Sequence, residues 1–178
     1  MGSKGIFTLN LVLIAAALIA SVALWGMLPN QVPIHFNFSG VPDRWVDRSF
    51  FSWYLLPLIA LAMVGFFLAV TSFATRSPKL WNVPNPRLWL ALSPEQREPV
   101  LEAFRRFMAW TSLRVTIIMI IVQTAVYLTA IRTIAGVTWY TGLLVLGLAG
   151  YTIVRGFMLE KVLARAIEEA GGGTEVAA

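Results

Sequence analysis

The residues best suited to chemistry lie in one polar loop, residues 28–48, with the sequence LPNQVPIHFNFSGVPDRWVDR. This loop holds the only histidine of the chain, His35, together with Asp43 and Asp47. A histidine near carboxylates is typical of metal sites and of acid–base catalysis. Zinc sites, however, usually have three or four protein ligands, and these residues would supply at most three at irregular spacing. A metal-dependent activity at the loop is therefore the weaker hypothesis.

Other catalytic and cofactor-binding patterns are missing from the sequence. The chain has no cysteine, no HExxH or GxSxG motif and no glycine-rich loop of the kind that binds phosphate. No second histidine is present to activate a serine. We therefore expect a protein that is not an enzyme, with no catalytic residue, metal or cofactor, and we expect His35 to form a hydrogen bond within its own loop.

The loop also has the features of a stiff, folded cap. Pro29 and Pro33 favour extended residues before them, so the segment around them should resemble a β-strand. Asn37 to Gly40 and then Pro42-Asp43 have the composition of turns. Apolar side chains alternate with polar ones along the strand-like segment, and we expect them to anchor the cap: Ile34, Phe36 and Phe38, with Val41 and Trp45 further on. The polar and aromatic residues that we expect to contact a ligand or protein partner are His35, Asn37, Asp43, Arg44 and Trp45.

Four long apolar segments predict a membrane protein. The chain has 178 residues, of which 58% are hydrophobic and only 13% are charged, about half the charged fraction of a soluble domain. The segments are each long enough to cross about 30 Å of hydrocarbon as a helix. They span residues 6–28, 51–74, 113–133 and 136–156. The expected fold is a single all-α domain, a bundle of four transmembrane helices in which Asn10 and Gln123 form hydrogen bonds between helices.

The charges predict an orientation. Eleven of the fourteen lysines and arginines flank one side of the expected bundle: Lys4, Arg76, Lys79, Arg87, Arg97, Arg105, Arg106, Arg114, Arg155, Lys161 and Arg165. Because cytoplasmic loops are enriched in such residues, we expect both termini and loop 75–112 in the cytoplasm and loop 29–50 in the periplasm of a bacterial inner membrane. This distribution around membrane segments, rather than on one basic face, excludes a nucleic-acid partner.

The expected cytoplasmic segments are amphipathic. Residues 93–110 carry apolar and basic residues at helical spacing, and we expect a helix, bent or restarted at Pro99, that lies on the inner leaflet and rises into the third span. The fourth helix should continue into a cytoplasmic tail, residues 157–171. The residues that we expect to contact lipid or a protein partner on this side are Trp81, Trp89, Arg97, Arg105 and Arg106.

The sequence of the polar loop resembles the signature of a bacterial membrane family. Leu28, Pro29, Pro33, His35, Phe36, Asn37, Gly40, Pro42, Asp43 and Trp45 fit the pattern LP-x-x-(I/V)-P-x-H-(F/W)-(N/D)-x-x-G-x-P-D-x-(W/Y). This pattern is similar to that of the domain of unknown function at the N-terminus of SdpI-type immunity proteins, and the resemblance covers about residues 8–75. A second segment, NVPNPRLWLALSPEQRE, resembles a cytoplasmic segment of standalone members. The resemblance implies a multi-span protein without established catalysis.

Two classes of function remain open. The best-known members of the family protect a producing cell from a secreted toxin and can hold a repressor at the membrane, which implies an immunity- or sensor-like protein that acts through protein–protein interaction. The chain has four expected spans and lacks the second half of the larger immunity proteins. The alternative is an accessory or structural subunit of a larger membrane complex.

Overall fold

Four long helices and one small β-hairpin make up the protein. A computed structural model describes residues 1–77 and 81–172, so Lys79, counted above for the orientation, lies outside the described residues. The elements are α1 (Ser3–Leu24), η1 (Trp25–Met27), β1 (Gln31–Phe36), β2 (Pro42–Asp47), α2 (Phe50–Arg76), α3 (Pro86–Ala91), α4 (Pro94–Ala130) and α5 (Trp139–Gly172). The expected fold class is confirmed, because α1, α2, α4 and α5 are each long and apolar enough to cross a membrane.

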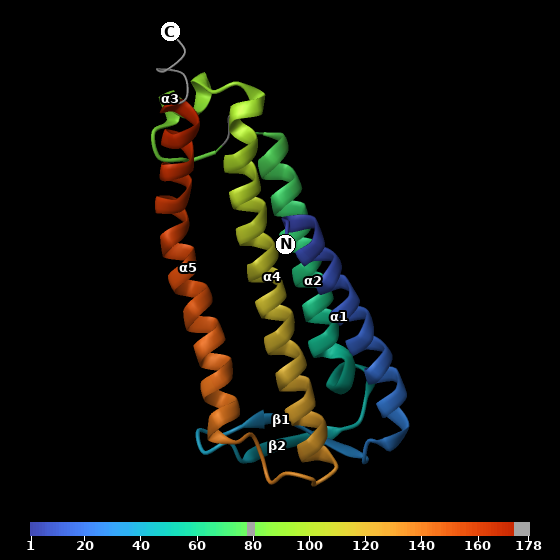
Figure 1. Cartoon of the computed structure of the whole chain (residues 1–178). Helices are drawn as coiled ribbons and strands as arrows, with labels where there is room; N and C mark the ends of the chain where they lie inside the picture. The colour runs from blue at the N-terminus through green and yellow to red at the C-terminus, as the bar shows by residue number, and fades with distance from the viewer. Residues whose placement is uncertain (78–80, 173–178) are drawn as a thin grey trace.

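Helix α4 is the centre of the bundle. It packs against α1, α2 and α5, whereas the contacts of α5 are mainly with α4 and the short helix α3. Strands β1 and β2 lie across one end of the bundle, and α3 lies at the other (Figure 1). We call residues 25–49 and 131–138 the hairpin end, and residues 81–108 and 157–172 the α3 end.

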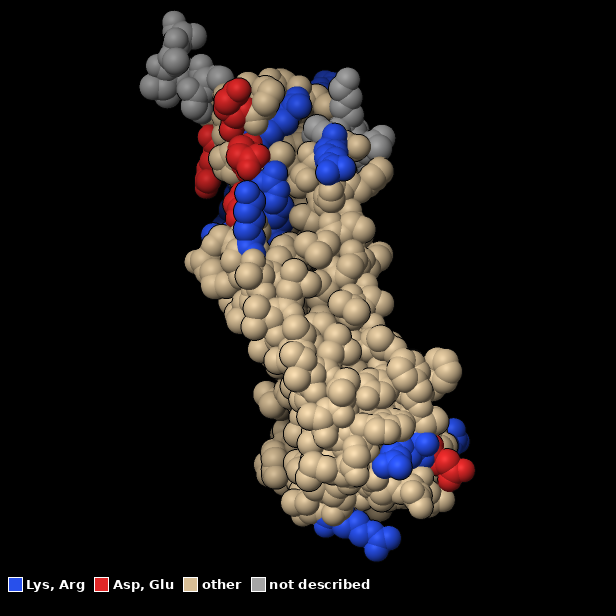
Figure 2. Space-filling view, turned by 90° about the vertical axis from the view of Figure 1, so that its right-hand side faces the viewer, with Lys and Arg blue, Asp and Glu red and all other residues tan. Residues whose placement is uncertain are grey.

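Charged side chains gather at the two ends. Figure 2 shows lysines, arginines and acids at the α3 end, a smaller group at the hairpin end and an uncharged surface between them. A long uncharged surface between two charged ends is what a bilayer requires of a spanning protein. The chain is therefore a multi-pass membrane protein.

Helix starts follow the capping patterns in the sequence. The Ser49 side chain accepts a hydrogen bond from the backbone N–H of Ser52 at the start of α2, and Ser93 accepts one from Gln96 at the start of α4. Both pairs form reciprocal capping boxes, which satisfy backbone N–H groups that a helix start leaves open. The first box fixes the point at which the chain leaves β2 and enters α2.

The helix expected over residues 93–110 does rise into the third span, but the expectation that it lies on the inner leaflet and bends or restarts at Pro99 is wrong. These residues form the first half of α4, which continues through Pro99 without interruption to Ala130. Pro99 is the sixth residue of α4, so it leaves the carbonyl of Glu95 without its helical N–H donor but does not end the helix. The apolar side chains of this half pack into a protein core rather than facing lipid, and this core consists mainly of Val83, Trp89, Leu92, Val100, Leu101, Phe104, Leu163 and Ile167.

Helices α4 and α5 are longer than a membrane is thick. At about 1.5 Å per residue, their 37 and 34 residues extend about 50–55 Å, against about 30 Å of hydrocarbon. Their excess length forms the α3 end. The expected continuation of the fourth span is confirmed, since α5 runs without a break to Gly172.

Polar side chains connect the spans as expected. The Asn10 amide donates to the hydroxyl of Ser112 at 2.7 Å, joining α1 to α4, and both side chains are buried. The Gln123 amide donates to the backbone carbonyl of Trp53 at 3.1 Å, joining α4 to α2. In a regular helix that carbonyl would accept from residue 57, which is Pro57 and has no N–H. Gln123 thus replaces the hydrogen bond that the proline removes.

Candidate functional site

The hairpin is anchored on the bundle by one apolar side chain. Val32 is fully buried among Leu28, Trp53, Val126 and Ala130, which come from the chain before β1 and from α2 and α4. The Trp53 indole in turn donates to the backbone carbonyl of Ser21 in α1 at 2.8 Å. Three helices therefore support the first strand.

Arg48 closes the base of the hairpin. Its guanidinium donates to the backbone carbonyls of Trp25 at 3.1 Å and Leu28 at 2.7 Å, where the chain leaves α1. The same group lies 5.2 Å from the centre of the Trp25 ring, a favourable cation–π distance. Sequence reasoning gave Arg48 only a role in orientation, since nothing in its neighbours shows that η1 turns its carbonyls toward it.

The turn of the hairpin is built by Asn37. Its side-chain oxygen accepts from the backbone N–H groups of Ser39 and Val41, each at 3.0 Å. Gly40 follows with φ of +75°, a conformation that favours glycine. Asn37 was expected to contact a partner, and its side-chain oxygen instead holds the turn. Pro42 and Asp43 were expected in a turn, and they begin β2 instead.

The turn also rests on the loop before α5. The N–H of Val137 donates to the carbonyl of Gly40 at 2.8 Å. A Cβ atom added at Gly40 would lie 1.9 Å from the Val137 carbonyl oxygen, and one added at Gly136 would lie 2.1 Å from the Gly40 carbonyl oxygen. Both glycines are needed for this close approach, so the hairpin is fixed at its tip as well as at its base.

A bulge alters which side chains the hairpin exposes. The strand pairing is antiparallel, with His35 opposite Arg44 and Trp45 opposite Pro33, and the register shifts on both sides of His35. A bulge rotates the residues that follow it relative to simple alternation. Ile34 beside the bulge is exposed, and so are Phe38 and Val41 in the turn and Trp45 in β2, which corrects the expectation that these side chains anchor the cap. Of the expected anchors, Phe36 packs against the core. The buried anchors are Val32 and the adjacent Pro33.

His35 and Asp43 form an exposed pair on this surface. The His35 Nδ1 atom lies 2.5 Å from the Asp43 Oδ1 atom, and the two side chains are 60% and 45% exposed. The expected hydrogen bond of His35 within its own loop is therefore confirmed. Asn37, Arg44 and Trp45 are also exposed, so all five predicted contact residues lie on the accessible surface of one small hairpin.

The surroundings of the pair give it no enclosed site. Two cavities at the hairpin end, of about 490 and 580 Å³, are lined by neither His35 nor Asp43. Over residues 1–77 and 81–172, no group of three or more histidine, cysteine, aspartate or glutamate side chains is placed to hold a metal ion. The arrangement is that of a contact surface with one hydrogen-bonded His–Asp pair, flanked by the fully exposed ring of Phe38.

The predicted contact residues at the α3 end hold the fold together instead. Trp89 is 1% exposed and stacks on Trp81 with ring centres 5.4 Å apart, so it is a core residue and not a surface contact. The Arg97 guanidinium donates to the carbonyls of Trp89 and Leu90. Arg105 forms ion pairs with Glu98 at 2.6 Å and with Glu102 at 3.6 Å. The partners of Arg97 are set by the packing of α3 on α4, whereas those of Arg105 lie one and two turns before it on α4 itself.

Arg106 has a different environment from those residues. It is exposed and lines a cavity of about 320 Å³ between α4 and α5. Two further arginines, Arg114 and Arg155, line the same cavity. Sequence reasoning used these two only for the orientation, since their meeting depends on how α5 packs against α4.

The family comparison matches the part of the chain that contains the hairpin. Residues 12–61 match the family described as "Domain of unknown function (DUF1648)". This segment is a DUF1648 domain. It begins within α1, includes η1 and the whole hairpin, and ends within α2. Comparison with curated proteins and comparison with solved structures gave no match.

The residues that build the hairpin lie within the DUF1648 domain. The residues of α4 and of the loop before α5 that contact the hairpin lie outside it. Val32, Arg48, Asn37 and Gly40 all lie inside it. Of the resemblance found for residues 8–75, the presence of a domain of unknown function is thus confirmed over residues 12–61. The turn residues of the signature have a physical explanation, since Asn37 and Gly40 build a tight turn that the bundle holds in place.

Proposed function

We propose that this protein is a non-enzymatic, immunity- or sensor-like protein of a bacterial inner membrane, which binds a protein ligand through the hairpin. The hairpin faces the periplasm and the α3 end faces the cytoplasm. The excess of lysine and arginine at the α3 end supports this orientation. The resemblance of the DUF1648 domain to that of SdpI-type immunity proteins supports the class of function.

The observation that carries the proposal is a rigid hairpin that presents exposed aromatic and charged side chains. Trp45 and Phe38 are exposed on it beside the His35–Asp43 pair and Arg44. Tryptophan and arginine are enriched among the residues that dominate binding energy at protein interfaces. Because Val32, Arg48 and Gly40 fix the hairpin on the bundle, little conformational entropy would be lost when it binds.

A survival assay tests the proposal. Cells that lack the gene are complemented with the natural protein, with a His35→Ala/Trp45→Ala variant or with a Trp139→Ala control, and are grown in medium conditioned by the natural strain. Trp139 is 77% exposed at the start of α5, outside the hairpin, so its substitution controls for the loss of an exposed ring. We expect the deletion and the hairpin variant to lose survival and the control to restore it. Equal survival of the deletion and the natural strain would refute the immunity proposal.

A second candidate function is that of an accessory subunit, and α5 favours it. None of residues 139–160 in α5 is buried, and Gly142, Gly147 and Gly150 face open space. Small residues on an open helix face permit close packing of another helix. Mass determination after purification in mild detergent separates the candidates: a stoichiometric larger complex supports the subunit, and a lone monomer or dimer contradicts it.

A further inference from the structure

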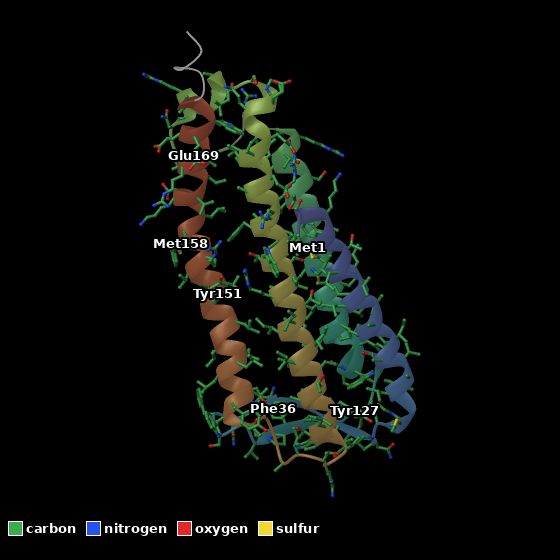
Figure 3. The ribbon with its side chains drawn as sticks, in the orientation of Figure 1. Met1, Phe36, Tyr127, Tyr151, Met158 and Glu169 are labelled. Atoms are coloured by element: carbon green, nitrogen blue, oxygen red, sulfur yellow. The ribbon has the colours of Figure 1, made fainter. Side chains whose placement is uncertain are left out.

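Three arginines converge on the cavity between α4 and α5, which we call the arginine pocket. Arg106 and Arg114 come from α4 and Arg155 comes from α5. Trp110 lies between the two α4 arginines along the same face, and Leu159 and Val162 form part of the wall from α5. In Figure 3 the pocket lies beside the stretch of α5 between Tyr151 and Met158. This position is where the apolar part of α5 meets its polar continuation.

The charge of the pocket is not neutralised by the protein. In the part of the chain that the structure describes, none of the three arginines takes part in an ion pair, and no acid is among the residues that line the cavity. Three like charges around one cavity repel each other, and the repulsion is strong where water is partly excluded. An arrangement of this kind is stabilised when an anion enters it.

Arg114 shows most directly that a partner is missing. One terminal nitrogen of its guanidinium is buried and has no hydrogen-bond partner within the described residues. The guanidinium lies 4.8 Å from the centre of the Tyr151 ring and 5.9 Å from that of Trp110, so the two aromatic rings hold it in place. A buried donor without an acceptor is costly, and an oxygen of a bound anion would satisfy it.

The chemistry of the pocket selects a phosphate group. Guanidinium groups bind phosphate oxygens with two parallel hydrogen bonds, and arginine is the usual residue for such contacts. Basic pockets between transmembrane helices at the membrane surface are known to hold anionic lipid headgroups. On the side of Arg155 that faces the centre of the bilayer, α5 exposes Tyr151, Ile153 and Val154, side chains that acyl chains can cover. We propose that the arginine pocket binds the phosphate of an anionic phospholipid, with the acyl chains against α5.

The test titrates lipids into the purified full-length protein in mild detergent and follows the midpoint of thermal unfolding. Phosphatidylglycerol should raise the midpoint with saturation, because a ligand that binds only the folded state stabilises it. Phosphatidylcholine, which carries a phosphate but no net charge, should not. Inorganic phosphate, up to millimolar concentration, should neither raise the midpoint nor compete with phosphatidylglycerol.

Substitutions assign the effect to the pocket. An Arg106→Gln/Arg155→Gln variant changes two exposed residues and is expected to fold. Its apparent affinity for phosphatidylglycerol should fall about 25-fold, about fivefold for each arginine. In an Arg114→Gln variant the affinity for phosphatidylglycerol should fall at least about fivefold. The matched control is Arg165→Gln, an exposed arginine on α5 that does not line the pocket, and its affinity should be unchanged.

Each contrary result overturns the proposal. An undiminished phosphatidylglycerol effect in the double variant would show that the pocket is not the site. If phosphatidylcholine raised the unfolding midpoint as much as phosphatidylglycerol, the net negative charge of the lipid would have no role in binding. Stabilisation by inorganic phosphate that competes with the lipid would identify a free anion as the ligand and refute the lipid assignment.

Discussion

The bond between Gln123 and the Trp53 carbonyl gives a quantitative prediction. Pro57 removes the helical donor for that carbonyl, Trp53 is 1% exposed, and the Gln123 amide supplies the replacement at 3.1 Å. A Gln123→Met substitution keeps a side chain of similar length but has no donor. A buried carbonyl without a partner costs about 1–3 kcal/mol, and hydrogen bonds between membrane helices are worth about 0.6–1.7 kcal/mol. We expect a loss of about 1–1.5 kcal/mol in the free energy of unfolding.

The reason for this loss is tested by restoring the backbone donor. In a Pro57→Ala background, residue 57 has an N–H that can bond to the Trp53 carbonyl. Gln123→Met should then cost at most about 0.3 kcal/mol, which gives a coupling energy of about 1 kcal/mol in a double-mutant cycle. The cavity left by the proline ring is present in both members of the Pro57→Ala comparison and in neither member of the natural one, so it cancels.

The assay is reversible unfolding in mixed detergent micelles, followed by tryptophan fluorescence. Thr124→Val is the matched control, because the hydroxyl of Thr124 bonds only to the carbonyl of Ile120 in its own helix. Its effect should stay within about 0.5 kcal/mol. Equal losses from Gln123→Met in the natural and Pro57→Ala backgrounds would refute the reasoning.

Three further predictions concern the hairpin. Gly40→Ala places a Cβ 1.9 Å from the Val137 carbonyl oxygen at a residue with positive φ. Hydrogen exchange in the loop before α5 should therefore rise about 30-fold or more, equivalent to about 2 kcal/mol. The control Gly26→Ala, which has open space around it, should leave exchange unchanged. Val32→Ala removes two fully buried methyl groups and should cost about 2 kcal/mol by chemical unfolding, against less than about 0.5 kcal/mol for the exposed neighbour Ile34→Ala; similar losses would show that Val32 is not the anchor. His35→Ala breaks the contact between the exposed side chains of His35 and Asp43 and should change the free energy of unfolding by less than about 1 kcal/mol, so a larger loss would give the pair a structural role.

The spans were predictable because their physical cause is local. Twenty or more apolar residues in a row identify a transmembrane helix, whatever surrounds them. Capping at Ser49 and Ser93 was equally local, and the pattern around Ser93 was visible in the sequence. The surroundings of residues 94–112 could not be predicted from the sequence, because the apolar face of an amphipathic helix can pack equally well against lipid or against protein. Only the packing of α3 and α5 on α4 decides that Trp89 and Phe104 lie in a protein core.

The candidate site shows the same division. The turn at Asn37 and Gly40 and the internal bond of His35 follow from residue types that favour them. The bulge beside His35 reversed the expected exposure of Ile34, since alternation assumes a regular strand, and Phe38 lies beyond the strand in the turn. The arginine pocket required residues from two helices to meet across about forty positions of sequence, which no periodicity within one helix reveals.

The orientation of the hairpin is the central claim, and thiol labelling tests it most directly. The chain has no cysteine, so a Phe38→Cys variant carries one reactive group at the exposed tip of the hairpin, and a Glu169→Cys variant carries one at the α3 end (Figure 3). A maleimide that does not cross the inner membrane is applied to intact cells whose outer membrane is permeabilised. We predict labelling of the Phe38→Cys variant in intact cells and of the Glu169→Cys variant only after lysis. The reverse pattern would contradict the account.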